Sequence, residues 1–390
     1  MRKLLAITLI IAFLISVAGC KKQSSASGTT STQQNPTQQD PAQETETEPT
    51  IPQENPTIAQ KPMYAVSLVP QTEETVDESG MVRFRYKYQN ISLIMPEPSI
   101  AERIILDYHN RMDKADQYAD SVRVESMRDE YKAMGVTLMN YIEYKPARFD
   151  TGVLSLNINQ MIYLGGVHPD YVSTSVTYDL LTGNVLKLSD VLNRDITPGS
   201  IANTIVSKLT DKDYLWPNFE EIIAETLTDA LDTCEIWYFN NNGLCFHYDP
   251  YVLAPYAAGP ITVEIPYSEL LGVLRDEYFP AEQDSYSGSL TAEMFTADTQ
   301  KDFTQFAETV LVENGTKILL SADGAIADIT IETESVESGT TTVMAVQSLT
   351  PGDAIMVEFD PSAKLLITYR NGNQYETKSL AYIDDKILIS

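Results

Sequence analysis

The chain has 390 residues, with 27 lysines and arginines against 55 aspartates and glutamates, so its formal net charge is −28 at pH 7. A chain this acidic repels the phosphates of DNA and RNA and has no basic patch that could release their counterions, which excludes nucleic-acid binding. The charge favours encounters with cationic partners, but it also favours simple solubility, and both interpretations stay open. The length predicts two or three domains.

The first twenty residues have the pattern of an export signal. Two basic residues precede an uncharged apolar run, Leu4 to Val17, which is shorter than the roughly 20 residues that a membrane span needs. Small residues then stand immediately before Cys20, an ending that resembles the lipobox of bacterial lipoproteins. The resemblance implies a signal peptide over 1–19, acylation of Cys20, and a lipid anchor in the cell membrane on its extracytoplasmic face. The alternative is an ordinary signal peptide with a cysteine there by chance.

Residues 20–62 are predicted to be the lipidated cysteine followed by a disordered tether. They are rich in Ser, Thr, Gln, Pro and Glu, and they have almost no large apolar side chains with which to offset the entropy of ordering. Folded structure is predicted to begin near Met63, with strands at 64–69 and 82–95.

A long helix is predicted after Pro98, because large apolar residues recur there at helical spacing with charged residues between them. This helix either continues or restarts up to Met134, and Gly135 provides a natural end. Beyond it, three alternating segments predict strands, and two shorter helices follow. The strands are expected at 136–149, 153–164 and 172–181, and the helices at 200–209 and 219–231.

A hairpin is predicted between residues 235 and 248. Phe239 would then face Leu244, which places Cys245 opposite Tyr238 rather than opposite Cys234. An exported protein can form a disulfide, but this register favours two partly buried thiols. A strand at 261–265 and a short helix at 268–273 complete the pattern. Residues 63–280 are therefore predicted to form an α+β domain, an antiparallel sheet with packed helices.

The composition changes after Pro280. Residues 281–294 are small and polar and are predicted to form a linker, and residues 295–390 are predicted to be a separate, small all-β domain with one helix at 301–309. The pair Asn371-Gly372 between two alternating segments is the clearest hairpin signal in the chain. Strands are expected at 317–321, 326–333, 341–349, 354–359, 365–369, 375–382 and 386–389.

Two phrases in the middle domain together resemble a known extracellular module. The first begins at Gly165-Gly166-Val167-His168 and ends at Leu188-Ser189-Asp190-Val191-Leu192, and the second runs from Ala254-Pro255-Tyr256-Ala257-Ala258-Gly259-Pro260-Ile261 into Ile265-Pro266-Tyr267-Ser268-Glu269-Leu270. Their order and spacing are similar to the extracellular domain pair of the lysozyme-sensing anti-sigma-V factors. The same pair precedes the catalytic domain of a class of peptidoglycan deacetylases. The resemblance covers about 63–280 and implies a module that binds a ligand, lysozyme in the anti-sigma factors, without being a catalyst by itself.

The chain departs from both relatives. An anti-sigma factor needs a cytoplasmic segment to hold its sigma factor, but only three residues precede the apolar run. A deacetylase of this type uses an Asp and two His residues around a metal, but the segment from residue 295 contains no histidine. We therefore expect the sensing module without either familiar effector.

Two His-x-Asp pairs are candidates for chemistry, namely His168-Pro169-Asp170 and His247-Tyr248-Asp249. Residues two apart in an extended segment share a face, so the pairs could supply two imidazoles and two carboxylates to a metal if they were adjacent in space. The alternative is that both histidines simply pack. The chain has no Gly-x-Ser-x-Gly and no His-Glu-x-x-His motif, so we expect no catalytic residue, no metal and no other cofactor.

Tyrosines gather around the second phrase and suggest a binding rim on the loop 249–260, since loops on a rigid scaffold often carry recognition. Tyrosines beside acidic groups suit either a cationic protein or a sugar chain, and the alternative is that they fill the core. The candidate ligand-binding residues are His168, Asp170, Asp249, Tyr251 and Tyr256.

These patterns favour a non-catalytic surface lipoprotein whose α+β module binds a cationic protein such as lysozyme, or a peptidoglycan fragment. Two alternatives remain open. The first is a cell-envelope hydrolase or metal-dependent enzyme that uses His168 and His247. The second is a structural or assembly lipoprotein whose module only docks a neighbour.

Overall fold

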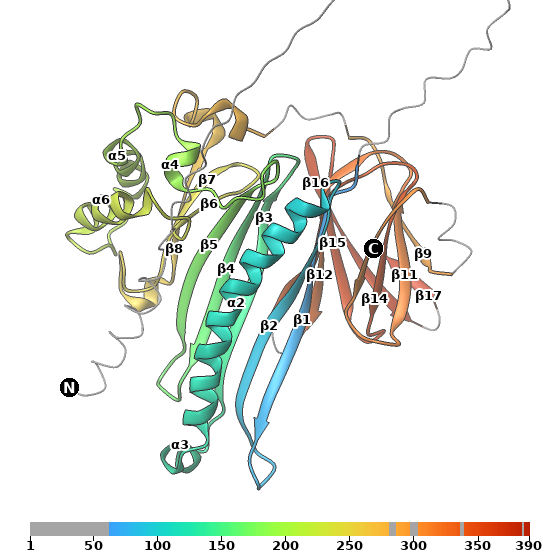
Figure 1. The fold of residues 1–390 in the computed structure, drawn as a ribbon, viewed down its shortest axis with the longest axis horizontal. Coiled ribbons are helices and arrows are strands. Elements are labelled where there is room, and N and C mark those ends of the chain that lie inside the picture. Colours follow the sequence, from blue (N-terminus) through green and yellow to red (C-terminus); the bar gives the residue numbers. More distant parts are fainter. Residues whose placement is uncertain (1–61, 281–285, 297–302, 336–338, 384–385) are drawn as a thin grey trace, which may run out of the picture. The chain divides into compact units, whose positions relative to one another are not determined.

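The computed structural model describes residues 62–280, 286–296, 303–335, 339–383 and 386–390. The predicted signal peptide, Cys20 and nearly all of the predicted tether lie outside these residues. Lys61–Ser390 form one compact unit. Across the described ranges, no helix is both long and apolar enough to cross a membrane. Strands outnumber helices in the described chain, an α+β-like arrangement of sheets (Figure 1).

The largest sheet has ten strands in the order β17-β16-β15-β12-β13-β1-β2-β3-β4-β5. Its pairing is antiparallel except between β2 and β3, which run parallel because a helical crossover connects them. The five strands that come first in the chain are β1 (Ala65–Val76), β2 (Val82–Ile94), β3 (Leu138–Phe149), β4 (Val153–Tyr163) and β5 (Asp170–Asp179).

Helix α2 (Pro98–Ser126) makes the crossover and lies along one face of the strands β2 to β5 (Figure 1). Ile104, Tyr108 and Met112 recur every four residues, and they pack into one apolar cluster with side chains from the sheet. The helix restarts as α3 (Asp129–Met134), which ends at Gly135 in the left-handed conformation, as the sequence predicted.

The alternation of strand β4 gives this sheet two different faces. Leu154, Leu156 and Ile158 belong to the apolar cluster beneath α2. The residues between them are polar and point to the opposite side, because successive side chains alternate across a strand. We call this side of β2 to β5 the polar face.

A second group of elements surrounds a three-stranded sheet in the order β6-β7-β8. The apolar core of this group contains the side chains of Trp237, Phe239 and Phe246 from the strands and Ile205 and Leu227 from the helices. The elements are α4 (Leu188–Val191), α5 (Pro198–Leu209), α6 (Phe219–Ala230), β6 (Trp237–Phe239), β7 (Gly243–Tyr248) and β8 (Ile261–Pro266).

The hairpin β6–β7 has the predicted register. Phe239 pairs with Leu244, and Tyr238 pairs with Cys245. Cys245 and Cys234 are both buried free thiols, which confirms the expectation drawn from that register.

The C-terminal strands are divided between two sheets, whose facing sides form a shared apolar core. A four-stranded sheet has the order β10-β14-β11-β9, and the remaining strands extend the ten-stranded sheet. The four are β9 (Leu290–Met294), β10 (Gln305–Val310), β11 (Thr316–Ala322) and β14 (Asp353–Phe359). The others are β12 (Ile326–Ser335), β13 (Gly339–Leu349), β15 (Lys364–Asn371), β16 (Gln374–Ile383) and β17 (Lys386–Ile389).

Strand β1 joins the two predicted domains. Residues 65–67 pair with β2 on one side and with β13 on the other. Ala65 packs into the core of the C-terminal strands, and Val66 packs into the cluster beneath α2. The boundary predicted between 63–280 and 295–390 therefore falls inside one hydrogen-bonded sheet.

Two local predictions in the C-terminal part are wrong. The predicted helix at 301–309 gives way to β10, whose residues 305–310 pair in parallel with β14, because this backbone pairing outweighs a weak local preference. The predicted linker ends in β9, since Leu290 packs into the core and the strand pairs with β11. Residues 281–285 of that linker lie outside the described residues.

Candidate functional site

Two of the segments that the sequence singled out meet in space. The imidazole of His168 stacks on the ring of Tyr256, with centroids 3.8 Å apart and planes 22° apart. The ring of Tyr251 lies 5.5 Å from that of Tyr256. The Tyr256 hydroxyl donates a hydrogen bond of 2.9 Å to the carbonyl oxygen of Pro169, which joins the loop to the start of β5. We call His168, Tyr171, Tyr251 and Tyr256 the aromatic rim.

The aromatic rim is exposed where a ligand could reach it. Tyr251 is 57% exposed and Tyr171 is 47% exposed. Tyr251 has a φ of 72°, a conformation that is uncommon for a residue with a side chain, and the indole nitrogen of Trp216 donates to its carbonyl oxygen at 3.2 Å. Such backbone strain tends to occur in loops that bind or react. Partial loss of contact with water raises the pKa of the Tyr256 hydroxyl, and the neighbouring Tyr171 and Asp170 raise it further.

The two carboxylates of the predicted site have different surroundings. Asp170 is exposed at the first residue of β5, beside the aromatic rim. Burial raises the pKa of Tyr118 on α2, and the charge of Asp170 adds to this shift. Asp249 is the first residue of the loop, and its Oδ1 accepts a hydrogen bond of 2.8 Å from the backbone N–H of Ser173. Burial raises the pKa of Asp249 to about 6, and the Ser173 bond opposes part of this shift. Asp249 therefore attaches the loop to β5.

His247 does not join the aromatic rim. It is buried on β7, and its Nε2 lies 3.4 Å from the hydroxyl of Ser175. Burial lowers the pKa of His247 to about 4, so the ring is neutral at pH 7. His168 and His247 thus have separate partners. In the part of the chain that the structure describes, no group of three or more His, Cys, Asp or Glu side chains is placed to hold a metal.

The cysteine near His247 is not activated. Burial, with a smaller contribution from Glu264, raises the pKa of the Cys245 thiol to about 12. A reactive cysteine needs the opposite shift, because only the thiolate is a nucleophile.

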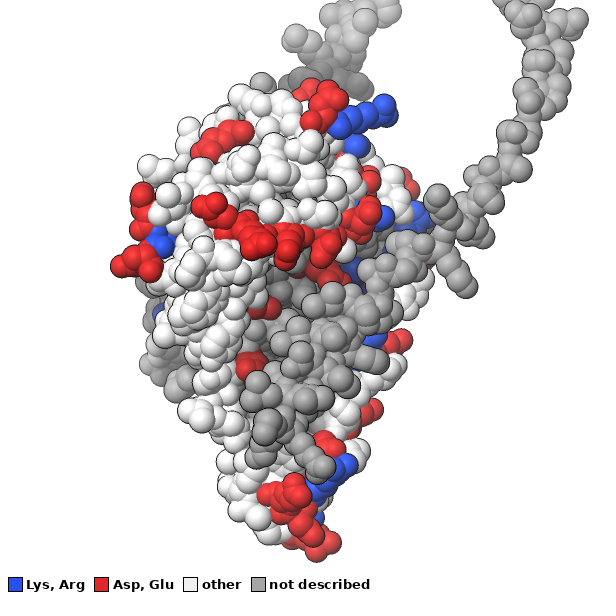
Figure 2. Space-filling model, turned by 90° about the vertical axis from the view of Figure 1, so that its left-hand side faces the viewer, with Lys and Arg blue, Asp and Glu red and all other residues white. Residues whose placement is uncertain are grey.

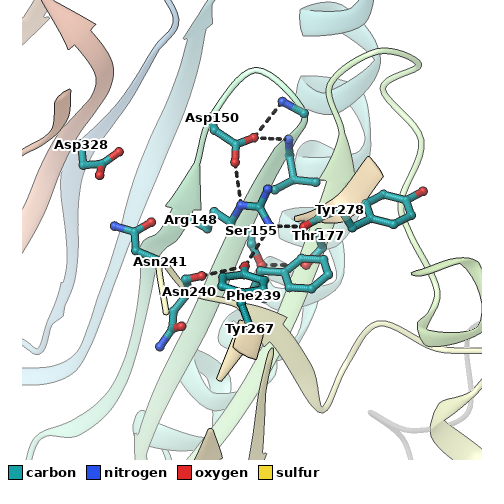
Figure 3. Close-up of polar contacts among 12 residues, drawn as sticks. Arg148, Asp150, Ser155, Thr177, Phe239, Asn240, Asn241, Tyr267, Tyr278 and Asp328 are labelled. Carbon is teal, nitrogen blue, oxygen red and sulfur yellow. Dashed lines mark hydrogen bonds and ion pairs between the residues drawn. The ribbon is translucent and has the colours of Figure 1, made fainter. Parts of the chain in front are cut away.

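A buried arginine that no sequence motif indicated holds the β6–β7 hairpin against the large sheet (Figure 3). The Arg148 side chain is 3% exposed and pairs with Asp150 at 2.6 Å. It donates to the Tyr267 hydroxyl at 2.8 Å and to the carbonyl oxygen of Tyr278 at 2.6 Å, and its guanidinium lies 5.2 Å from the Phe239 ring centroid. One basic residue at the end of a predicted strand gives no signal of Phe239, Tyr267 and Tyr278, which lie far along the chain.

A second set of contacts ties the same hairpin to the C-terminal strands. Asn241 donates through Nδ2 to the Tyr375 hydroxyl at 2.9 Å, and that hydroxyl donates to Asp328 at 3.0 Å. Asp328 also pairs with Arg370 at 2.7 Å. Asn241 and Asp328 are labelled in Figure 3. We assign these contacts a positioning role, because Asn241, Tyr375, Asp328 and Arg370 bond to one another in one continuous chain of contacts.

Acidic side chains gather on the face of the molecule that carries α5 and α6, where Figure 2 shows a band of Asp and Glu and few Lys or Arg. No Lys or Arg occurs between Asp213 and Leu274. Four acidic residues of α6 are exposed, namely Glu220, Glu221, Glu225 and Asp229. The resulting field attracts cationic molecules and weakens with added salt.

Comparison with known proteins identifies one family in this region. A family model described as "Protein of unknown function (DUF3298)" matches residues 195–268, so this segment, from α5 through β8 with Tyr251 and Tyr256, is a DUF3298 domain. A solved DUF3298 family member from Bacteroides fragilis has 18% identity and a TM-score of 0.41, covering 54% of this chain and 94% of that chain. A second, from Pseudomonas aeruginosa, has 17% identity and a TM-score of 0.35, covering 56% and 97%. No curated protein matches the chain.

Proposed function

We propose that this chain is a non-catalytic, lipid-anchored binding protein of the cell envelope, and that its aromatic rim binds a cationic protein such as lysozyme or a fragment of the cell wall. The observation that carries the proposal is the stack of His168, Tyr256 and Tyr251, which joins two distant segments on an exposed surface. Stacked rings offer a large contact area and lose little conformational entropy on binding.

The position of the rim agrees with the family resemblance. His168 stands in the first phrase that resembles the extracellular module of the anti-sigma-V factors, and Tyr256 stands in the second. Their contact brings the two sequence segments together at one surface. Asp170 beside the rim and the acidic face of α5 and α6 supply the charge that a cationic partner would meet.

The binding proposal is tested by calorimetric titration of the purified full chain with lysozyme, and separately with soluble muropeptides, at low and moderate salt. The variant Tyr256→Ala removes one ring of the stack and should weaken binding about tenfold. Tyr214→Ala is the matched control, because Tyr214 is 43% exposed but lies on the connection between α5 and α6. Its affinity should stay within about twofold of the parent. Failure of the parent chain to bind either ligand at either salt would remove the proposal.

The anchor is tested separately. In cells grown with a fatty-acid probe, the parent chain should become labelled and the variant Cys20→Ser should not, since the thioether forms on that sulfur. A parent chain that stays unlabelled while Cys20 is intact contradicts the lipoprotein proposal and leaves the binding proposal standing.

No observation favours the two alternatives over this proposal. An enzyme that uses His168 and His247 together would need both rings at one site, but one ring stacks on Tyr256 and the other is buried against Ser175. A purely structural role would leave the exposed rings of the aromatic rim without a purpose.

A further inference from the structure

The polar face of the large sheet carries ordered rows of side chains next to the aromatic rim. Tyr171 on β5 pairs with Met161 on β4, which pairs in turn with Tyr141 on β3. Tyr141 then pairs with Lys87 on β2. Residues that are paired across strands point to the same side of a sheet, so these residues form one row. We call it the apolar row after Tyr171, Met161 and Tyr141, and Lys87 forms its end on β2.

A parallel row of polar side chains lies beside the apolar row. Ser173 pairs with Asn159, which pairs with Glu143, and the Ser173 hydroxyl donates to the Asn159 Oδ1 at 3.2 Å. The next row contains Asn157 paired with Lys145. These three residues, Asn159, Asn157 and Glu143, are half-buried, and the side chain of Asn157 lies against Tyr238 of β6 at the edge of the hairpin. We call this set the polar rows.

Two acceptors of the polar rows are unused. Within the described residues, the Oε1 of Glu143 and the Oδ1 of Asn157 have no hydrogen-bond partner. A buried acceptor that has no donor destabilises the protein. A ligand that donates hydrogen bonds to these two oxygens would therefore gain binding free energy at both.

The charge of this face differs from that of the chain as a whole. Glu143 is paired with Lys145 at 3.3 Å, and Lys87 lies 4.8 Å from the centroid of the Tyr141 ring. Arg85 is paired with Glu74 at 2.7 Å. Positive and negative groups are therefore balanced here, although the chain carries −28 overall. A cationic protein gains no long-range attraction from this face, whereas an uncharged ligand is not disfavoured.

We propose that the polar face binds a chain of uncharged, N-acetylated sugar rings, which extends the ligand site from the aromatic rim across β5, β4 and β3. This inference rests on the proposed function and names one of its two ligand classes. The apolar faces of the rings stack on Tyr171, Met161 and Tyr141, and their hydroxyl and amide groups donate to Glu143, Asn157 and Asn159. Strands lie about 4.8 Å apart, so the apolar row from β5 to β2 spans roughly 14 Å, which accommodates a short oligosaccharide.

The test titrates the purified full chain with chitohexaose, an uncharged oligomer of N-acetylglucosamine, and in parallel with lysozyme. Tyr141→Ala removes a ring of the apolar row, and Met161→Gln keeps the volume but makes the row polar, so that a folded variant is available if the first is unstable. Asn110→Ala and Tyr214→Ala are the controls, because both residues are exposed away from the polar face, on α2 and on the α5–α6 connection. Unfolding midpoints in urea establish that each variant is folded.

The expected result is that chitohexaose binds the parent chain, that Tyr141→Ala and Met161→Gln each weaken this binding about fivefold or more, and that both controls stay within about twofold. Equal sugar affinity in the parent and in a folded row variant overturns the inference. Absence of chitohexaose binding, with lysozyme still bound through Tyr256, also overturns it but leaves the proposed function intact. Absence of binding to both probes overturns the two together.

Discussion

His247 and Asp249 stand two residues apart and both contact β5, yet their pKa values move in opposite directions. Burial lowers the pKa of His247 to about 4 and raises that of Asp249 to about 6. The cause is the same in both, because burial disfavours whichever form carries the charge. Both residues are therefore neutral near pH 5.

These shifts make opposite contributions to stability in acid. The unfolded chain protonates His247 near pH 6.5 but the folded chain only near 4, so the fold loses up to about 3 kcal/mol as the pH falls through this window. The folded chain protonates Asp249 near pH 6 but the unfolded chain only near 3.8, so the fold gains a similar amount, about 3 kcal/mol, over nearly the same window. In the parent chain the two contributions largely cancel.

Substitution should reveal each contribution separately. Between pH 7 and 4.5, Asp249→Asn should lose about 2 kcal/mol more unfolding free energy than the parent chain, because only the histidine contribution remains. His247→Gln should lose about 2 kcal/mol less than the parent. Urea unfolding at the two pH values measures both. Variants whose pH profiles run parallel to that of the parent would contradict this account.

Arg148 offers a second prediction for a single side chain. Arg148→Ala should lower the free energy of unfolding by about 3 kcal/mol, because it leaves Asp150 without its cation and the Tyr267 and Tyr278 oxygens without a donor. Arg128→Ala is the control, since that side chain is 63% exposed, and it should change stability by less than about 0.5 kcal/mol. Equal effects of the two substitutions would show that the buried network contributes nothing.

The strand β7 depends on one glycine at its first residue. A Cβ added to Gly243 would collide with the carbonyl oxygen of Ile265 on β8. Gly243→Ala should therefore separate the two strands and lower the unfolding free energy by about 3 kcal/mol. Gly166→Ala is the control, because its Cβ would meet no atom closer than 3.7 Å. Thermal unfolding of both variants measures the difference, and a Gly243→Ala chain as stable as the control would contradict it.

Elements whose signal is local could be predicted from the sequence. Helical spacing located α2, and the turn at residues 240–243 set the register of β6 and β7. The predicted pair of residues at 371–372 does join β15 to β16. Elements that depend on distant partners could not be predicted. The strand β10 exists because β14 lies beside it, and two partners of Arg148, Tyr267 and Tyr278, come from segments more than a hundred residues away.

The residues of the candidate site also fall into those that a local sequence signal indicated and those that only the fold brings together. The family phrases and the density of tyrosines indicated His168, Tyr251 and Tyr256, which do lie together. The pattern His-x-Asp suggested similar roles for His168 and His247, but only the fold places one ring at the surface and the other in the interior. The rows on the polar face depend on strand pairing, and no segment by itself contains them.

The continuous sheet predicts how the described chain unfolds. Because β1 pairs with both β2 and β13, the middle and C-terminal strands should unfold in one cooperative transition in urea. Fluorescence of the two tryptophans, Trp216 and Trp237, reports on the DUF3298 domain, and hydrogen exchange of β12 and β15 reports on the C-terminal strands. Their midpoints should coincide, and two separate midpoints would show independent domains.

The central place of β1 also has a consequence for the growing polypeptide. This strand leaves the ribosome before every other described strand, yet the neighbour on one of its sides, β13, is translated almost last. Contacts so distant along the chain form slowly, because a long loop must close first. The nascent protein therefore carries an unsatisfied strand edge through most of its synthesis, and a chaperone that shields residues 65–67 would protect it at its most aggregation-prone moment.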